Sequence, residues 1–134
     1  MKDQLKEVNQ FHKKFNVGDA PCSPTLIEKK EYLLRYNLTV EENREYLDAC
    51  LQGNLVEVAD ALGDKLYILL GTILKHGMQD KIIDVFNEIH ASNMSKLDSN
   101  GNPIFREDGK ILKGENYFKP NLKQFIDEQP KQSI

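Results

Sequence analysis

The stretch TVEENREYLDACLQGNLVEVADALGDKLY, residues 39–67, decides the fold. Its apolar residues recur at three- and four-residue spacing on both sides of a Gly53-Asn54 break, which predicts two amphipathic helices. Asn54 is a suitable N-cap for the second of them. Because short helix–helix connections join antiparallel neighbours, we expect these two helices to fold back on each other.

The helical pattern extends to both sides of this stretch. Residues 4–15 predict a first helix, and residues 26–51 predict a second helix whose N-cap is Ser23 or Thr25. Residues 78–97 predict a fourth helix after the one that follows Asn54. The sequence therefore predicts a core of four helices.

The helix after Asn54 is the strongest helical segment, and we expect Gly77 to end it as a C-cap glycine. We expect its apolar stripe to be buried; the stripe consists of Leu55, Val58, Leu62, Leu66, Leu69 and Ile73. The buried side of the next helix is expected to consist of Ile82, Val85, Phe86, Ile89 and Met94.

After the helices the composition changes to glycines, prolines and turn residues. Asp108-Gly109, between PIFRE and KILKG, predicts a short β-hairpin, and residues 122–128 predict a brief terminal helix. The fold class is therefore all-α with a β-hairpin-like tail, in a single domain over residues 1–134. Its expected parts are an N-terminal helix and loop (1–20), a helical core (24–98) and the tail (99–134).

The composition excludes several classes of protein. A net charge of −3 argues against a nucleic-acid binder, which would show a basic stripe. The chain has no apolar run long enough for a membrane span and no apolar segment typical of a signal peptide. With Cys22 and Cys50 as the only cysteines, a disulfide framework is not expected, and the cytoplasm is the expected location. The three histidines are too dispersed for a zinc site.

Carboxylates gather on both helices of the opening stretch. Glu42 and Glu45 are three residues apart, as are Glu57 and Asp60, and Asp64 follows one turn later. Counted outward from the break, Glu45 and Asp60 lie at similar height, so the acidic patches are expected to face each other. Such like charges repel, and a hard divalent cation such as Mg²⁺ relieves the repulsion. The pattern therefore predicts a metal site for a phosphate ester or anhydride.

A second interpretation needs no metal. Thr39 to Glu42 fits the S/T-x-x-E capping box, in which Glu42 closes a helix start. Glu57 lies in the first turn after Asn54, where negative charge interacts favourably with the helix dipole. Spacing alone leaves both interpretations open.

The acidic motifs resemble those of a known superfamily. EENRE, followed eleven residues later by EVAD, resembles the E-x-x-E … E-x-x-D signature of the all-α nucleoside triphosphate pyrophosphohydrolases. This superfamily includes MazG-type enzymes, dimeric dUTPases and phosphoribosyl-ATP pyrophosphohydrolase. ALGDKLYILLGT is similar to the continuation of the second helix, and SNMSKL with DGKILKGENYFKPNL is similar to the tail of a MazG-like, phosphoribosyl-ATP pyrophosphohydrolase-like branch. The resemblance covers about residues 35–122.

The resemblance implies a Mg²⁺-dependent enzyme, with Mn²⁺ as an alternative, that hydrolyses a nucleoside triphosphate between its α and β phosphates. The products are a nucleoside monophosphate and pyrophosphate, as in an enzyme that cleans the nucleotide pool. The implied metal ligands are Glu42, Glu45, Glu57, Asp60 and Asp64. The carboxylates expected to orient the attacking water or to accept its proton are Glu41 and Glu45.

The substrate also needs cations at the leaving pyrophosphate and groups that contact the sugar or base. The residues expected in these roles are Asn93, Lys96, Lys110, Lys113 and Tyr117. Gly109 and Gly114 are expected to let the backbone approach phosphate closely. Arg35 is expected either to reach phosphate or to pair with Glu31 one turn earlier.

Two other functions remain open at this point. Phosphoribosyl-ATP pyrophosphohydrolase of histidine biosynthesis uses the same metal chemistry on another substrate. A non-enzymatic helical interaction module would instead use the acidic face to bind a basic partner. The apolar stripes, together with the resemblance, predict a homodimer or tetramer. Nucleic acid and membrane are not expected as partners.

Overall fold

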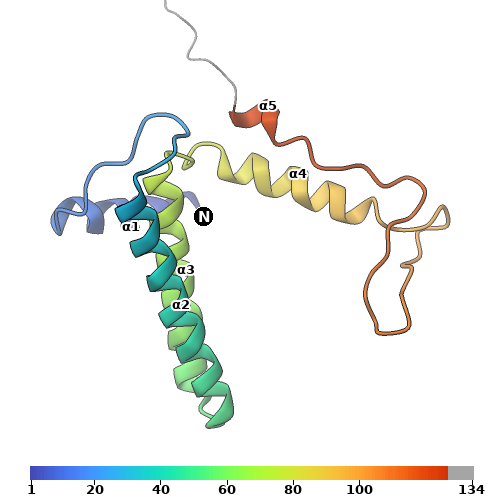
Figure 1. Cartoon of the computed structure of the whole chain (residues 1–134), viewed down its shortest axis with the longest axis horizontal. Helices are drawn as coiled ribbons and strands as arrows, with labels where there is room; N and C mark the ends of the chain where they lie inside the picture. The colour runs from blue at the N-terminus through green and yellow to red at the C-terminus, as the bar shows by residue number, and fades with distance from the viewer. Residues whose placement is uncertain (127–134) are drawn as a thin grey trace, which may run out of the picture. The chain divides into compact units, whose positions relative to one another are not determined.

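A computed structural model of the chain describes residues 1–126, which separate into two compact units, Met1–Asp80 and a second unit that begins at Lys81. The first unit contains helices α1 (Lys2–Lys14), α2 (Lys29–Leu51) and α3 (Leu55–Lys75), and the second contains α4 (Ile82–Met94) and α5 (Lys123–Ile126) (Figure 1). The all-α class and the four predicted helices are confirmed. The expectation that residues 1–134 form one domain stays a prediction.

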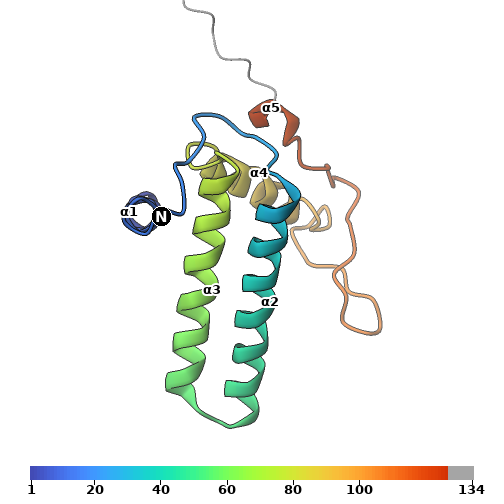
Figure 2. The same cartoon turned by 60° about the vertical axis from the view of Figure 1, so that its left-hand side comes forward.

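Helices α2 and α3 form an antiparallel hairpin, as the Gly53-Asn54 break predicts (Figure 2). Gly53 has φ +65°, a left-handed conformation that glycine adopts without a steric penalty. The Asn54 side chain accepts a hydrogen bond from the Glu57 backbone N–H at 3.2 Å, which confirms Asn54 as the N-cap of α3. Gly77, with φ +64°, follows the end of the same helix, as predicted.

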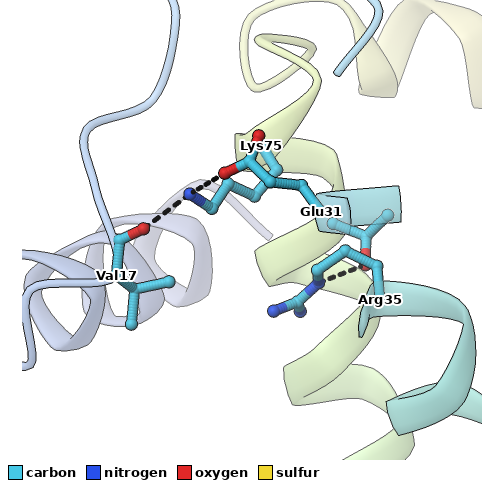
Figure 3. Close-up of polar contacts among 5 residues, drawn as sticks. Val17, Glu31, Arg35 and Lys75 are labelled. Atoms are coloured by element: carbon cyan, nitrogen blue, oxygen red, sulfur yellow. Dashed lines mark hydrogen bonds and ion pairs between the residues drawn. The ribbon is translucent and has the colours of Figure 1, made fainter. Parts of the chain in front are cut away.

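A buried arginine fastens α2 to α3. Arg35 is 9% exposed, and its Nε donates to Thr72 Oγ1 at 3.0 Å (Figure 3). Its Nη2 donates to the Ile68 carbonyl at 2.7 Å. The guanidinium lies directly against Gly71, where an added Cβ would come within 2.5 Å of Arg35 Nη2. The predicted pairing of Arg35 with Glu31 is wrong, because the arginine crosses to α3 instead.

Lys75 ties three segments of the first unit together. Its Nζ donates to the Val17 carbonyl at 2.6 Å, in the loop after α1, and to Glu31 Oε1 at 3.1 Å on α2 (Figure 3). His12, on α1, is also buried, and burial, together with the charges of Arg35 and Lys75, lowers its pKa. The loop after α1 is therefore tied to α3 by a hydrogen bond, and α1 itself packs against α3.

Helix α2 begins later than the sequence predicts. Its N-cap is Glu28, not Ser23 or Thr25. The Thr25 backbone N–H donates to the His76 carbonyl at 2.9 Å, and His76 Nδ1 lies 2.9 Å from the Thr25 carbonyl oxygen. These contacts hold Thr25 at the end of α3. Thr25 therefore does not join α2, which begins only at Lys29.

The helix faces are less buried than their periodicity predicts. Of the apolar stripe expected on α3, Ile73 is buried and Val58 is intermediate, while Leu55, Leu62, Leu66 and Leu69 are exposed. The same holds on α4, where Phe86, Ile89 and Met94 are exposed. The buried apolar residues among those described are Leu5, Val8, Ala49, Ala61, Leu70, Ile73 and Leu74. Buried small residues such as Ala49 and Ala61 let α2 and α3 approach closely, whereas Leu55, Leu62, Leu66 and Leu69 remain exposed.

In the second unit the predicted hairpin is present but minimal. Phe105 and Ile111 form an isolated antiparallel bridge, and Gly109 occupies the turn with φ +85°. The terminal helix covers Lys123–Ile126, while positions 127 and 128 of the predicted helix lie outside the described residues. No helix within residues 1–126 combines the length and apolar character that a bilayer crossing requires.

Candidate metal site and substrate-binding residues

Three carboxylates from the two arms of the hairpin converge. Glu42 and Glu45 on α2 and Asp64 on α3 each offer one oxygen, and these three oxygens lie within 4.8 Å of one another. Glu42 lies eleven residues before Gly53 and Asp64 lies eleven residues after it, so antiparallel helices of equal rise bring them to the same height. We call Glu42, Glu45 and Asp64 the carboxylate cluster.

The electrostatics of the carboxylate cluster are unfavourable without a cation. Glu42 Oε2 is buried and accepts no hydrogen bond within the described chain. Desolvation raises the pKa of Glu42, and the negative charges of Glu45 and Asp64 raise it further. A buried carboxylate oxygen without a donor, facing two more carboxylates, is the environment that a divalent cation stabilises.

The spacing of the oxygens also fits a single hard cation. In an octahedron around Mg²⁺, neighbouring oxygens lie about 3 Å apart and opposite oxygens about 4.2 Å apart. The three carboxylate oxygens lie within 4.8 Å of one another, so they must move closer together to bind one ion. Glu45 and Asp64 are exposed, so small rotations of their side chains close the difference. The residues present therefore fit Mg²⁺ or Mn²⁺.

The raised pKa of Glu42 makes a prediction for the metal-free protein. A carboxyl whose pKa is higher in the folded than in the unfolded state contributes stability that is complete below its ordinary pKa and is lost as the pH rises through the raised value. Glu42→Gln removes this titration, so its stability relative to wild type should increase as the pH rises above the ordinary glutamate pKa of about 4 and should remain higher once wild-type Glu42 is ionised. Urea unfolding in EDTA at a series of pH values measures the difference.

Asp48→Asn is the matched control for this experiment. Asp48 is an exposed carboxylate on the same helix and is not a member of the carboxylate cluster. Its replacement should produce no comparable gain with pH. A stability difference between Glu42→Gln and wild type that is the same at every pH would contradict the electrostatic explanation.

The capping-box interpretation of Glu42 is wrong. Thr39 and Glu42 lie in the middle of α2, which runs without a break from Lys29 to Leu51. Thr39 Oγ1 donates to the Arg35 carbonyl at 2.9 Å, one turn back along the helix. Glu42 therefore closes no helix start, and the capping box does not explain its position.

Three other predicted site residues lie near the carboxylate cluster without joining it. Glu41 is exposed on α2, and its charge also raises the pKa of Glu42. Glu57 is exposed in the first turn of α3, where its backbone N–H bonds to Asn54, and Asp60 is exposed one turn before Asp64. The structure does not bring Glu57 or Asp60 into the group of three carboxylates. Their metal-binding roles, and the catalytic role of Glu41, stay predictions.

Sequence reasoning overlooked the position of Lys65. Its Nζ donates to Asn43 Oδ1 at 3.1 Å and lies 4.9 Å from the centre of the Tyr46 ring, both on α2. This cation therefore bridges α2 and α3 directly beside Asp64. The only sign of this arrangement in the sequence is that Lys65 directly follows Asp64.

In the second unit, the SNMSK motif holds the tail. Ser92 is buried and its Oγ donates to the Phe118 carbonyl at 2.8 Å. Ser95 Oγ donates to the Ser92 carbonyl at 2.6 Å and accepts from the Phe118 N–H at 3.1 Å. The serines of the motif thus fix the returning chain, whereas Asn93, which sequence reasoning emphasised, is exposed.

The predicted substrate-binding residues of the tail are solvent-accessible. Lys96 is intermediate, Lys110 and Lys113 are exposed, and Lys113 Nζ lies 4.6 Å from the centre of the Tyr117 ring. The structure brings Lys113 and Tyr117 together, and substrate binding by these residues stays a prediction.

Gly109 and Gly114, the tail glycines expected to approach phosphate, have roles in the fold. Gly114 donates its N–H to the Lys96 carbonyl at 2.9 Å and lies so close to Leu97 that an added Cβ would meet the Leu97 carbonyl. Gly109 provides the positive φ of the hairpin turn. The close approach expected of the Gly114 backbone is present, and the group that it approaches is the Leu97 carbonyl.

Comparison with known proteins identifies the family of the chain. The family model described as phosphoribosyl-ATP pyrophosphohydrolase matches residues 8–93, which include the carboxylate cluster. No curated protein matches the sequence. A crystal structure of a candidate NTP pyrophosphohydrolase from Exiguobacterium sp. 255-15 is 25% identical and covers 87% of this chain and 88% of its own, with a TM-score of 0.47. From the family match we conclude that the chain belongs to the phosphoribosyl-ATP pyrophosphohydrolase family and is a hydrolase of the pyrophosphohydrolase type.

Proposed function

We propose that this protein is a Mg²⁺-dependent nucleoside triphosphate pyrophosphohydrolase that releases a nucleoside monophosphate and pyrophosphate. The observation that carries the proposal is the convergence of Glu42, Glu45 and Asp64 within 4.8 Å, with Glu42 Oε2 buried and without a donor. The match to the pyrophosphohydrolase family supports the same reaction type.

In the proposed mechanism the three carboxylates of the cluster would hold a divalent cation, with Mn²⁺ as an alternative to Mg²⁺. When bound, such a cation neutralises phosphate charge and lowers the pKa of a water that it binds. Glu41, exposed beside the cluster on α2, or Glu45 accepts the proton of the attacking water. Positioning and charge neutralisation are the main demands of phosphoryl-group chemistry, and these side chains supply both.

Incubation of the purified protein with a panel of nucleoside and deoxynucleoside triphosphates tests the proposal. Pyrophosphate and a monophosphate should appear with Mg²⁺ or Mn²⁺ and should be absent with EDTA. Release of orthophosphate and a nucleoside diphosphate would contradict the proposal, because these products arise from cleavage between the β and γ phosphates. If neither the triphosphates nor phosphoribosyl-ATP are cleaved, the alternative of a non-enzymatic helical module that binds basic partners is favoured.

A second candidate substrate is phosphoribosyl-ATP. The observation that favours it is the family model itself, which carries that description and matches most of the helical chain. Phosphoribosyl-ATP contains the same α–β anhydride, so the same carboxylates would serve its hydrolysis. Comparison of kcat/KM for phosphoribosyl-ATP and for the triphosphate panel under identical conditions distinguishes the two.

We also propose that the protein forms a homodimer or a tetramer through the uncovered apolar faces of α2 and α3. The exposed residues of these faces include Leu33, Leu34, Val40, Leu47, Leu51, Leu55, Val56, Leu62, Leu66 and Leu69. A monomer rarely exposes so much contiguous apolar surface, whereas an interface between subunits buries it.

Light scattering coupled to gel filtration should give a mass of two or four times 15.4 kDa. Leu62→Glu, at a side chain 51% exposed within the chain, should lower the mass toward that of one subunit because it would bury a charge between subunits. Leu26→Glu is the control, since Leu26 is 93% exposed in the loop before α2. A monomeric wild-type protein would contradict the proposal.

A further inference from the structure

Three exposed aromatic side chains form a group that includes Tyr67, three residues after Asp64 on α3. Phe11 and Phe15, at the end of α1, stack on each other with ring centres 4.3 Å apart and an angle of 28° between their planes. Tyr67 of α3 meets Phe11 edge-on, at 5.6 Å and 86°. We call Phe11, Phe15 and Tyr67 the aromatic cluster.

The aromatic cluster is ordered by its own contacts yet open to solvent. Phe15 is 67% exposed, Tyr67 41% and Phe11 39%. Stacked and edge-to-face rings stabilise each other, so their orientations are set before any ligand arrives. Exposed rings held in fixed geometry favour a flat aromatic ligand, because little side-chain entropy remains to be lost on binding.

Its position relative to the carboxylate cluster suggests which ligand this is. Tyr67 follows Asp64 by three residues on α3, and side chains at this spacing are neighbours on one helix face, with Cβ atoms about 5–6 Å apart. A ligand whose phosphates are held at Asp64 therefore has its next segment beside Tyr67. In a nucleotide that segment is the nucleoside.

We propose that the aromatic cluster stacks on the base of the nucleotide whose phosphates are held at the carboxylate cluster. This inference rests on the proposed function and adds to it a base-binding role for α1, a helix that sequence reasoning left without one. Stacking on an aromatic face is tolerant of base identity, so the cluster supplies affinity for bases in general.

The test compares ligands with and without a base. Calorimetric titrations with Mg²⁺ use α,β-imido-dATP and α,β-imido-dUTP, whose α–β linkage resists hydrolysis, and the α,β-imido analogue of ribose 5-triphosphate, which lacks a base. Wild type should bind the nucleotides more tightly than the base-free probe. Phe15→Leu, which keeps apolar bulk but removes the ring, should weaken nucleotide binding about 10-fold and leave the affinity for the base-free probe unchanged.

Two further variants keep the test decisive. Phe15→Tyr retains an aromatic face and should bind the nucleotides like wild type. Phe86→Leu makes the same change at a phenylalanine of α4 that is 63% exposed and should not affect the preference for nucleotides. Thermal unfolding of each variant verifies folding, and light scattering verifies its oligomeric state.

The outcomes separate this inference from the proposed function. If wild type binds neither the nucleotides nor the base-free probe, the proposed function fails. If wild type binds all three probes equally, or if Phe15→Leu weakens all of them alike, the proposed function stands and base stacking is overturned. Loss of nucleotide affinity that accompanies dissociation of the oligomer would also overturn it, since the rings would then serve contact between subunits.

Discussion

Asp64→Asn is expected to lower the rate of pyrophosphate release from nucleoside triphosphates by at least about 100-fold, the scale reached when one preorganised group that stabilises transition-state charge is lost. Asp64 is the carboxylate that α3 contributes to the cluster, so the substitution removes one of the three negative charges available to the cation. Glu42→Gln and Glu45→Gln should have effects of similar size. Initial rates of pyrophosphate release with Mg²⁺ measure all three.

Asp48→Asn again serves as the control and should keep the wild-type rate. It makes the same chemical change on α2 at an exposed carboxylate that is not part of the cluster. Full activity in the three cluster variants would show that the assigned site is not the catalytic one. Glu57→Gln and Asp60→Asn, assayed beside them, test the two remaining predicted ligands.

Gly71→Ala is expected to destabilise the fold by about 2 kcal/mol, the usual cost of overpacking a buried site and losing a hydrogen bond to a charged group. An added Cβ would lie 2.5 Å from Arg35 Nη2 and 3.0 Å from His12 Nε2. Arg35 would have to move away from the Ile68 carbonyl, and the carbonyl would lose its charged donor. Urea unfolding at a fixed protein concentration measures the change.

Gly63→Ala provides a control of opposite sign on the same helix. Gly63 has open space where its Cβ would be, and within α3 alanine favours the helix over glycine by about 1 kcal/mol. The first substitution should therefore lower stability and the second should raise it. If both variants were stabilised, the packing of Arg35 against Gly71 would not restrict the helix as described.

The sequence predicts the helices well because their signals are local. The three- and four-residue spacing places α1 to α4, and the Asn54 cap and the two glycines Gly53 and Gly77 mark their ends. The late start of α2 had no such signal, because it depends on hydrogen bonds between Thr25 and His76, which are far apart in the sequence.

The convergence of carboxylates from the two helices was predicted, while its register was displaced by one turn. Counting from the Gly53-Asn54 break matched Glu45 with Asp60, whereas the structure clusters Glu42 and Glu45 with Asp64. A count fixes height along the helices, but the rotation of each helix decides which carboxylate faces its partner. That rotation is set by Ala49, Ala61 and the Arg35 contacts, which only the folded chain reveals.

Burial was predicted least well, again for a physical reason. Periodicity shows which side of a helix is apolar, but it does not show whether the same chain covers that side. Leu62, Leu66 and Leu69 follow the predicted pattern and remain exposed. Similarly, the periodicity of the sequence does not indicate why position 71 is a glycine. The reason is that Arg35 packs against Gly71 in the folded chain.

Glu42 and Asp64 each lie eleven residues from Gly53, so the two arms of the hairpin have equal length up to these carboxylates. This equality restricts the insertions and deletions that the sequence can accept. A single-codon insertion or deletion between Gly53 and Asp64, within α3, would turn the aspartate by about 100° around the helix and slide it by about 1.5 Å. Such length variants would disable the protein as surely as a missense change at the carboxylate itself. Tolerated length variation in this segment is therefore expected only as matched additions of whole turns to both helices.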